Sequence, residues 1–186
     1  LKLYGLYVKI GHIKGEKDAF VIEEFFKSHL NDIHQENLTF FEKIYLYQSY
    51  VWYYYILQNF PLHFRNAKKW VDLFDANPEM KMNDTDLFMR GLHNLLNSIF
   101  YTSYYEKFDE IIDQLESFTL KNKTRFNINS EVISFQYIYT AKINKHFTEG
   151  TFTEGVKIIP ALEEELKKYS LHLDSHRILI FYYKMA

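Results

Sequence analysis

The sequence predicts an all-α protein, a right-handed α–α superhelix of about four antiparallel helix pairs followed by an unpaired last helix. Three observations favour this fold class. Only 6 glycines and 3 prolines interrupt 186 residues, whereas all-β chains are rich in turn residues. Apolar residues recur at spacings of three and four, the period of one helix face. Equivalent places in successive second helices, at Ala19, Ala67, Phe108 and Gly155, are separated by 48, 41 and 47 residues. Repetition at such a period is typical of a solenoid.

We expect a single helical-repeat domain over residues 1–186, with approximate units 1–35, 36–80, 81–124, 125–170 and an incomplete 171–186. In the first unit, the segment 3–13 turns at Gly15 into a second helix. In the second, Thr39 and Glu42 have the spacing of a capping box for a helix through about Asn59. Pro61 is predicted to form the turn, before an apolar stripe at Phe64, Ala67, Trp70, Val71 and Phe74.

The third unit begins where Asp84 or Thr85 can cap a helix that runs to about Tyr101. An interruption at 102–103 is short enough to join an antiparallel pair. The partner helix, 105–118, has the best amphipathic pattern in the chain, with its apolar residues on one face.

The fourth unit begins at Asn129 or Ser130, with a helix predicted to run to Phe147. Gly150 is the predicted corner, because a residue without Cβ takes the left-handed conformation that a helix end needs. Gly155 is predicted where the second helix crosses the first most closely, and Pro160 is expected to kink that helix. A last helix opens at Ser175. The chain starts without Met and stops inside an apolar run, so we expect a segment of a longer protein.

Composition narrows the classes of function. The net charge of −2 gives no overall field for nucleic acid, and we predict no nucleic-acid partner. The absence of cysteine excludes disulfides and thiolate metal sites, and a cytoplasmic location is the default. The stretch 44–64 has no charged residue and is long enough to span a bilayer. Its six tyrosines and Pro61 suit hydrocarbon poorly, so we predict a buried or groove-lining helix and no membrane association.

No motif in the sequence indicates catalysis, and we predict neither an enzyme nor a cofactor. His172 and His176 have a spacing that can place two imidazoles on one helical face for a metal. We favour the alternative, a helix start capped by Asp174 or Ser175. The carboxylates of "FDEIID" and "LEEELKK" are expected on solvated helix faces.

Two stretches, "EGTFTEGVKII" and "TSYYEKFDEII", resemble the corner and second helix of the tetratricopeptide (TPR) repeat, and "HRILIFYYKMA" resembles its first helix. Phe152 and Tyr105 match the aromatic of the pattern Gly-Asp-Tyr-x-x-Ala-x-x-x-Tyr, and Ala67 and Gly155 match its small residue. Phe108 departs from it, and the spacings exceed the usual period of roughly 34. The resemblance is to divergent bacterial scaffold or regulatory proteins, and it implies that the first helix of each pair lines a concave groove.

Polar and aromatic residues on the predicted inner stripes are therefore candidate peptide contacts. They are Arg90, His93, Asn94, Asn97, Tyr101, Tyr137, Thr140, Asn144, Lys184, Trp52 and Tyr53. Asparagine amides can pair with a peptide backbone, cations with a carboxylate, and aromatic rings give rigid contact area. His93 and Thr140 stand where the clamp of peptide-binding TPR domains favours a cation. The alternative is structural, with the asparagines bonded to neighbouring helices and the tyrosines of 40–59 in the core.

These residues predict a module that binds a protein or peptide in a concave groove without catalysis. One alternative is a regulatory domain that senses a small ligand or peptide and controls a linked output domain. Self-association into a homo-oligomer through exposed aromatic surface is another.

Overall fold

The structure is a computed structural model that describes residues 5–6, 8–9, 13–30, 33–102 and 104–186. Every regular element in these ranges is helical, which confirms the predicted all-α class for this part of the chain. Most of the predicted segment 3–13, and Ser103 of the predicted interruption, lie outside the described residues. The chain divides into two compact units, Leu1–Pro78 and Glu79–Ala186, and each is described by itself.

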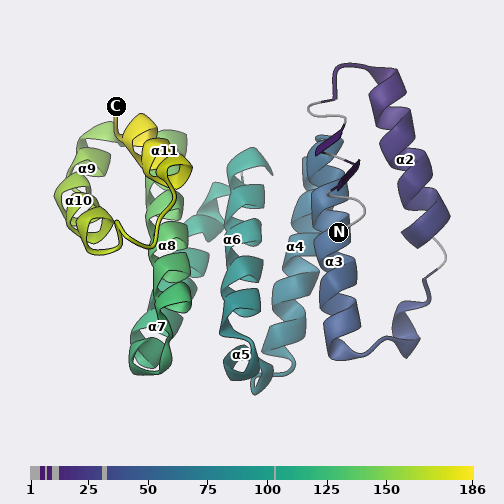
Figure 1. Ribbon diagram of the computed structural model, residues 1–186, viewed down its shortest axis with the longest axis horizontal. Helices are drawn as coiled ribbons and strands as arrows, with labels where there is room; N and C mark the ends of the chain where they lie inside the picture. Colours follow the sequence, from purple (N-terminus) through teal and green to yellow (C-terminus); the bar gives the residue numbers. More distant parts are fainter. Residues whose placement is uncertain (1–4, 7, 10–12, 31–32, 103) are drawn as a thin grey trace. The chain divides into compact units, whose positions relative to one another are not determined.

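The first unit contains α2 (Glu16–Leu30), a 3-10 turn η1 (Gln35–Asn37), α3 (Phe40–Ile56) and α4 (Phe60–Asp75). The helices α3 and α4 form a close pair, drawn side by side in Figure 1. The predicted capping box is confirmed. The Thr39 backbone N–H donates to Glu42 Oε2 at 2.8 Å, and the Glu42 N–H donates to Thr39 Oγ1 at 3.4 Å. Two otherwise orphaned backbone donors at the start of α3 are thereby satisfied.

The prediction that Pro61 forms the turn between these helices is wrong. The turn lies just before it and contains Gln58 at φ +56°. Asn59 then caps α4, accepting a hydrogen bond from the Leu62 N–H at 3.3 Å. Pro61 lies in the first turn of α4, where the missing N–H removes no intrahelical bond.

A buried aromatic pair joins α2 to α3. Tyr53 stacks on Phe26, with ring centroids 3.7 Å apart, and Ile22 and Ile56 complete the cluster. On α4 the predicted stripe is confirmed, since Ala67, Trp70, Val71 and Phe74 are buried and Phe64 is half-buried. The uncharged stretch 44–64 is thus part of two helices with a turn between them. Among the described residues, no helix combines the length and the apolar character needed to cross a bilayer.

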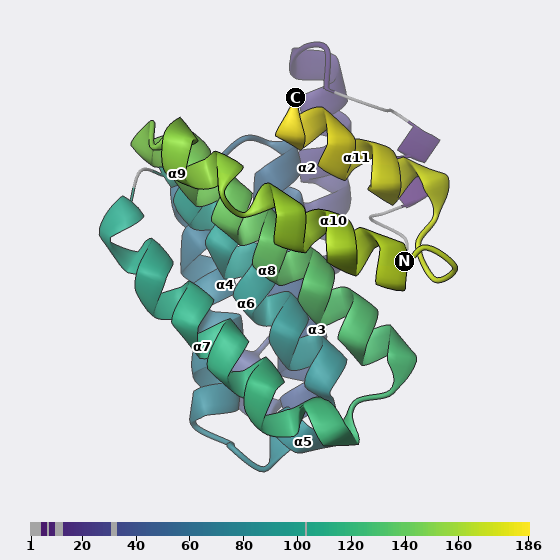
Figure 2. The same cartoon turned by 90° about the vertical axis from the view of Figure 1, so that its left-hand side faces the viewer.

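The second unit begins with the short α5 (Met80–Asn83) and α6 (Thr85–Thr102), followed by η2 (Tyr105–Lys107) and α7 (Phe108–Asn122). After η3 (Lys123–Arg125) come α8 (Ile128–Glu149), α9 (Phe152–Val156), α10 (Ile159–Lys168) and α11 (Ser175–Met185). Figure 2 shows α7 and α10 on either side of α8. The apolar face predicted for 105–118 is buried at Phe108, Ile111, Ile112 and Leu115. The α-helix itself starts three residues later than predicted, after a 3-10 turn.

Polar residues fix the starts of α6 and α8. Asp84 caps α6 as predicted, because its Oδ1 accepts from the Leu87 N–H at 3.1 Å. The helix α8 begins at Ile128, slightly before the predicted start at Asn129 or Ser130, and Asn127 caps it, accepting from the Ser130 N–H at 2.9 Å. The Asn129 amide and the Ser130 hydroxyl instead donate to the two carboxylate oxygens of Asp86, each at 2.6 Å. They tie the start of α8 to the start of α6.

The two glycines near the end of α8 are placed as predicted. Gly150 ends α8 in the left-handed conformation at φ +67°. A Cβ on Gly155 would lie 3.0 Å from the Cβ of His146, so α9 crosses α8 closely at this point. The predicted second helix is divided into α9 and α10, and Pro160 occupies the first turn of α10.

The last helix packs on an apolar cluster through Phe181, with Ile178 and Met185 beside it. Phe181 is the buried residue of α11, and its ring centroid lies 5.5 Å from that of Phe135 on α8. Both belong to a cluster that also includes Leu162, Leu166 and Tyr169. The helix α11 therefore packs against α8 and α10.

Candidate functional site

Six of the predicted groove residues come together on three helices of the second unit. They are Arg90, His93 and Asn97 on α6, Tyr137 and Asn144 on α8, and Lys184 on α11. We call this set the polar cluster. It combines residues that are up to 94 positions apart in the sequence, so it exists only when α6, α8 and α11 are packed together.

His93 is at the centre of the polar cluster. Its ring stacks on that of Tyr137, with centroids 3.9 Å apart and planes 7° from parallel. Asn97 Nδ2 lies 3.1 Å from His93 Nε2. Since an amide nitrogen only donates, Nε2 is the acceptor, and the neutral ring carries its hydrogen on Nδ1. This Nδ1 is buried and has no hydrogen-bond partner among the described residues.

The electrostatic environment keeps His93 neutral. Burial, together with the positive charges of Arg90 and Lys184, lowers the pKa of His93 to about 3. A third positive charge between two cations is unfavourable, and so is charging a buried imidazole. The stacked ring therefore stays uncharged.

Lys184 is held by an uncharged partner. Its ammonium donates to Asn144 Oδ1 at 2.6 Å, and Asn144 is only 7% exposed. Burial lowers the pKa of Lys184 below its usual value. Within the described part of the chain, neither Lys184 nor Arg90 makes an ion pair with a carboxylate. Partly buried cations without counter-ions are unfavourable unless an anion reaches them.

The structure does not bring the other predicted groove residues into this set of contacts. Asn94 donates to the carbonyl of Arg90 in its own helix at 2.8 Å. Tyr101 is exposed and packs edge-on against Phe100, and Thr140 is half-buried on α8. Tyr53 lies in the core of the first unit, and Trp52 packs against the same cluster. The sequence pattern could not reveal that Phe26 covers Tyr53, since that contact joins separate helices.

Sequence analysis missed a second polar link between α8 and α11. Arg177 Nη1 donates to Gln136 Oε1 at 3.1 Å, while the buried Gln136 Nε2 has no partner among the described residues. Arg177 also pairs with Asp174 at 3.2 Å. The spacing of Arg177 and Lys184, seven residues on one helix, matches two turns and could have suggested that both reach α8.

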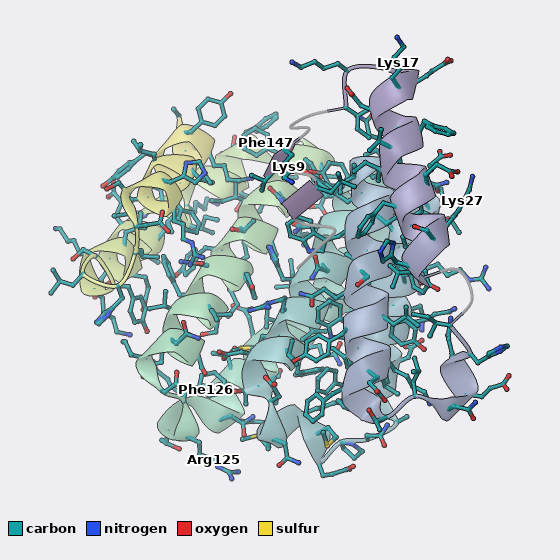
Figure 3. All side chains as sticks on the ribbon, turned by 45° about the vertical axis from the view of Figure 1, so that its right-hand side comes forward. Lys9, Lys17, Lys27, Arg125, Phe126 and Phe147 are labelled. Atoms are coloured by element: carbon teal, nitrogen blue, oxygen red, sulfur yellow. The ribbon has the colours of Figure 1, made fainter. Side chains whose placement is uncertain are left out.

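An apolar cavity adjoins Lys184. It measures about 300 Å³ and is lined mainly by apolar residues from the end of α8, from α9 and from α11. Phe147, Phe152 and Val156 supply much of its wall, and Figure 3 labels Phe147 near the end of α8. Phe147 and Phe152 meet edge-to-face at 5.7 Å. An anion held at Lys184 could therefore extend an apolar group into this space.

The histidine pair of the last segment has a different environment from a metal site. Asp174 caps α11, accepting from the Arg177 N–H at 2.8 Å, as the favoured prediction stated. Nowhere in the described ranges do three or more His, Asp or Glu side chains gather closely enough to hold a metal ion.

Comparison with known proteins identifies no relative. No protein-family model, no curated protein and no solved structure matches this chain.

Proposed function

We propose that the chain is a peptide-binding module, a TPR-like solenoid of helix pairs that docks an acidic segment of a partner protein on the polar cluster. The partner's carboxylate lies between Arg90 and Lys184, and an adjacent apolar side chain enters the cavity beside Lys184. A preformed helical surface of this kind binds by shape and charge and requires no catalysis. Such a module is suited to a scaffold role.

One observation supports this proposal above the others. The positive charges of Arg90 and Lys184 both lower the pKa of the neutral His93. Neither residue has a carboxylate partner in the part of the chain that the structure describes. The lysines of α8, by contrast, do have such partners, since Lys142 pairs with Glu116 and Lys145 pairs with Asp109. The cluster is therefore a place where an anion from outside gains two charge-assisted hydrogen bonds.

The test measures binding of fluorescent peptides by anisotropy. The peptides contain one apolar residue beside either glutamate or its neutral isostere, glutamine. We expect the glutamate peptides to bind at least about tenfold more tightly, with affinity that falls as salt rises. The variant Arg90→Ala/Lys184→Ala should lose this preference.

The matched control is Arg125→Ala/Lys157→Ala, which removes one arginine and one lysine from exposed positions outside the cluster. It has the same change in net charge and should bind as the natural chain does. Equal loss of binding in both double variants would show that only overall charge matters. Binding of glutamine peptides as tight as that of glutamate peptides would refute the proposal.

A ligand-sensing regulatory domain is the second candidate function. A larger cavity lined by α7, α8 and α10 favours it, because a concave space of this size is suited to a small molecule.

A further inference from the structure

A cavity of the second unit lies on the face of α8 opposite the polar cluster. It measures about 580 Å³, within the usual range for small-molecule sites. Its α8 wall includes Phe135, Ile138 and Lys142, whereas the cluster uses Tyr137 and Asn144 of the same helix. At 100° per residue these two sets point about 150° apart. The cavity is thus separate from the proposed peptide site.

Aromatic rings form the floor of this cavity. Phe135 packs against Tyr139 at 5.4 Å and against Tyr169 of α10 at the same distance. Phe126, which precedes α8, lines the opposite end. Figure 3 labels Phe126 close to the start of α8. Rings that line a cavity can pack against a flat apolar group and present their faces to a cation.

The charged residues at the edge of the cavity are mostly satisfied among themselves. Lys142 pairs with Glu116 at 2.6 Å, and Lys168 lies 3.5 Å from Glu165. Lys168 also donates to the Tyr169 hydroxyl at 2.7 Å and lies over its ring, 4.3 Å from the centroid. The wall therefore already holds one ammonium against an aromatic face.

Negative charge remains in excess after this pairing. Asp113, Glu116, Glu131 and Glu165 line the cavity together with Lys123, Lys142 and Lys168, which is four carboxylates against three ammonium groups. The Tyr169 hydroxyl donates to Glu131 Oε2 at 2.9 Å, so this carboxylate has a neutral partner. Asp113 makes no ion pair with another described residue.

Two hydroxyl groups that line the cavity have no hydrogen-bond partner within the described ranges. Thr119 Oγ1 is buried without a hydrogen bond among the described residues, and no described group bonds to the hydroxyl of the half-buried Tyr139. Burial raises the pKa of Tyr139, and the carboxylates of Glu165, Glu116 and Glu164 raise it further. Three carboxylates therefore lie close enough to act on this hydroxyl.

We propose that this cavity binds a small organic amine in its protonated form, with an aromatic or other flat apolar body against Phe135 and Tyr139. The ammonium donates to the Tyr139 oxygen and faces the carboxylates of Glu116 and Glu165. The apolar body displaces water from the aromatic floor. No bond is made or broken, and the site does not depend on the peptide-binding proposal.

The probes for the test are phenethylamine, the neutral 2-phenylethanol and the anionic 3-phenylpropionate, measured by ligand-observed NMR and calorimetry on the 186-residue chain. We expect the amine to bind at least tenfold more tightly than the alcohol, and the acid to bind more weakly than either. A preference for the alcohol or the acid would overturn the proposal, and so would the absence of saturable amine binding.

Three variants locate the binding. Tyr139→Phe removes only the hydroxyl and should weaken amine binding several-fold, while alcohol binding changes less. Ser117→Trp, at an exposed position that lines the cavity, should block all three probes. Glu116→Gln should weaken the amine, whereas Glu110→Gln, an equal charge change on the same helix outside the cavity lining, should not. Unchanged amine binding in Ser117→Trp would place the amine elsewhere and refute the proposal.

A separate arm distinguishes this site from the peptide site. Arg90→Ala/Lys184→Ala should leave amine binding as it is, because both residues lie outside the cavity lining. If the amine binds and the acidic peptides do not, the cavity stands and the peptide-binding function fails. If the acidic peptides bind and the amine does not, the amine-binding proposal fails and the peptide-binding function stands.

Discussion

Replacing Phe181 with alanine tests whether α11 is held by a single anchor. Phe181 is buried in the aromatic cluster of α8 and α10, whereas its neighbours Leu179 and Tyr183 are 64% and 86% exposed. Loss of a buried phenylalanine side chain costs about 3–5 kcal/mol. A helix of eleven residues has little stability of its own in water. Most of that cost should therefore appear as undocking of α11, with the remaining helices intact.

The magnitude converts directly to an observable. Since each 1.4 kcal/mol is a factor of ten, protection of the α11 amides against hydrogen exchange should fall by about 100-fold to 3000-fold. Mass spectrometry of the peptide that covers residues 175–186 measures this change. This loss of protection cannot exceed the factor that corresponds to the free energy with which α11 docks, because a fully undocked helix is no longer protected by docking.

Leu179→Ala is the control, since it removes an apolar side chain of similar size from an exposed position on the same helix. It should change protection by less than about threefold, which corresponds to the usual effect of a surface substitution. Equal loss of protection in both variants would refute the single-anchor account. Loss of protection spread evenly over α6 and α7 would show instead that the whole unit opens as one.

Three further predictions concern local structure and pH. Thr39→Ala should destabilise the chain by about 1 kcal/mol in urea unfolding, because it removes the capping hydroxyl, and Thr39→Ser should restore most of this. Gly150→Ala should cost about 1–2 kcal/mol, since alanine is strained at φ +67°, with asparagine less harmful. Burial lowers the pKa of His63 to about 4 and of His93 to about 3. The unfolded chain therefore binds more protons below pH 6.5, and each histidine should reduce stability by at most about 1.4 kcal/mol per pH unit on acidification. Urea titrations at pH 7 and pH 5 measure this slope, which His93→Phe should reduce.

Features that depend on neighbouring residues were predictable from the sequence. Thr39 with Glu42, Asp84 and Gly150 each satisfy backbone groups within four residues, and the pattern alone placed them correctly. Pro61 was misplaced because a proline in a first helical turn and a proline in a loop have the same sequence context. Within the candidate site, the α6 stripe followed from helical spacing.

Contacts between distant segments were beyond the pattern. The core position of Tyr53 depends on Phe26, 27 residues away, and the pairing of Gln136 with Arg177 depends on how α11 docks. Periodicity gives the face of a helix and does not give the neighbour that covers it. The same limit applies to the carboxylates of "LEEELKK" and "FDEIID", which were expected on solvated helix faces. The structure shows that Glu165 and Asp113 of these stretches line the large cavity.

The bond between Lys184 and Asn144 connects ligand capture to the lifetime of the protein. Lys184 lies on α11, the helix that contains the buried Phe181. A ligand bound to Lys184 therefore also stabilises the docked position of that helix. Bound ligand lowers the undocked population by the factor 1 + [L]/Kd. Where proteases cleave only the undocked helix, the rate of degradation follows the same factor. The concentration of undegraded protein would then depend on the concentration of its ligand.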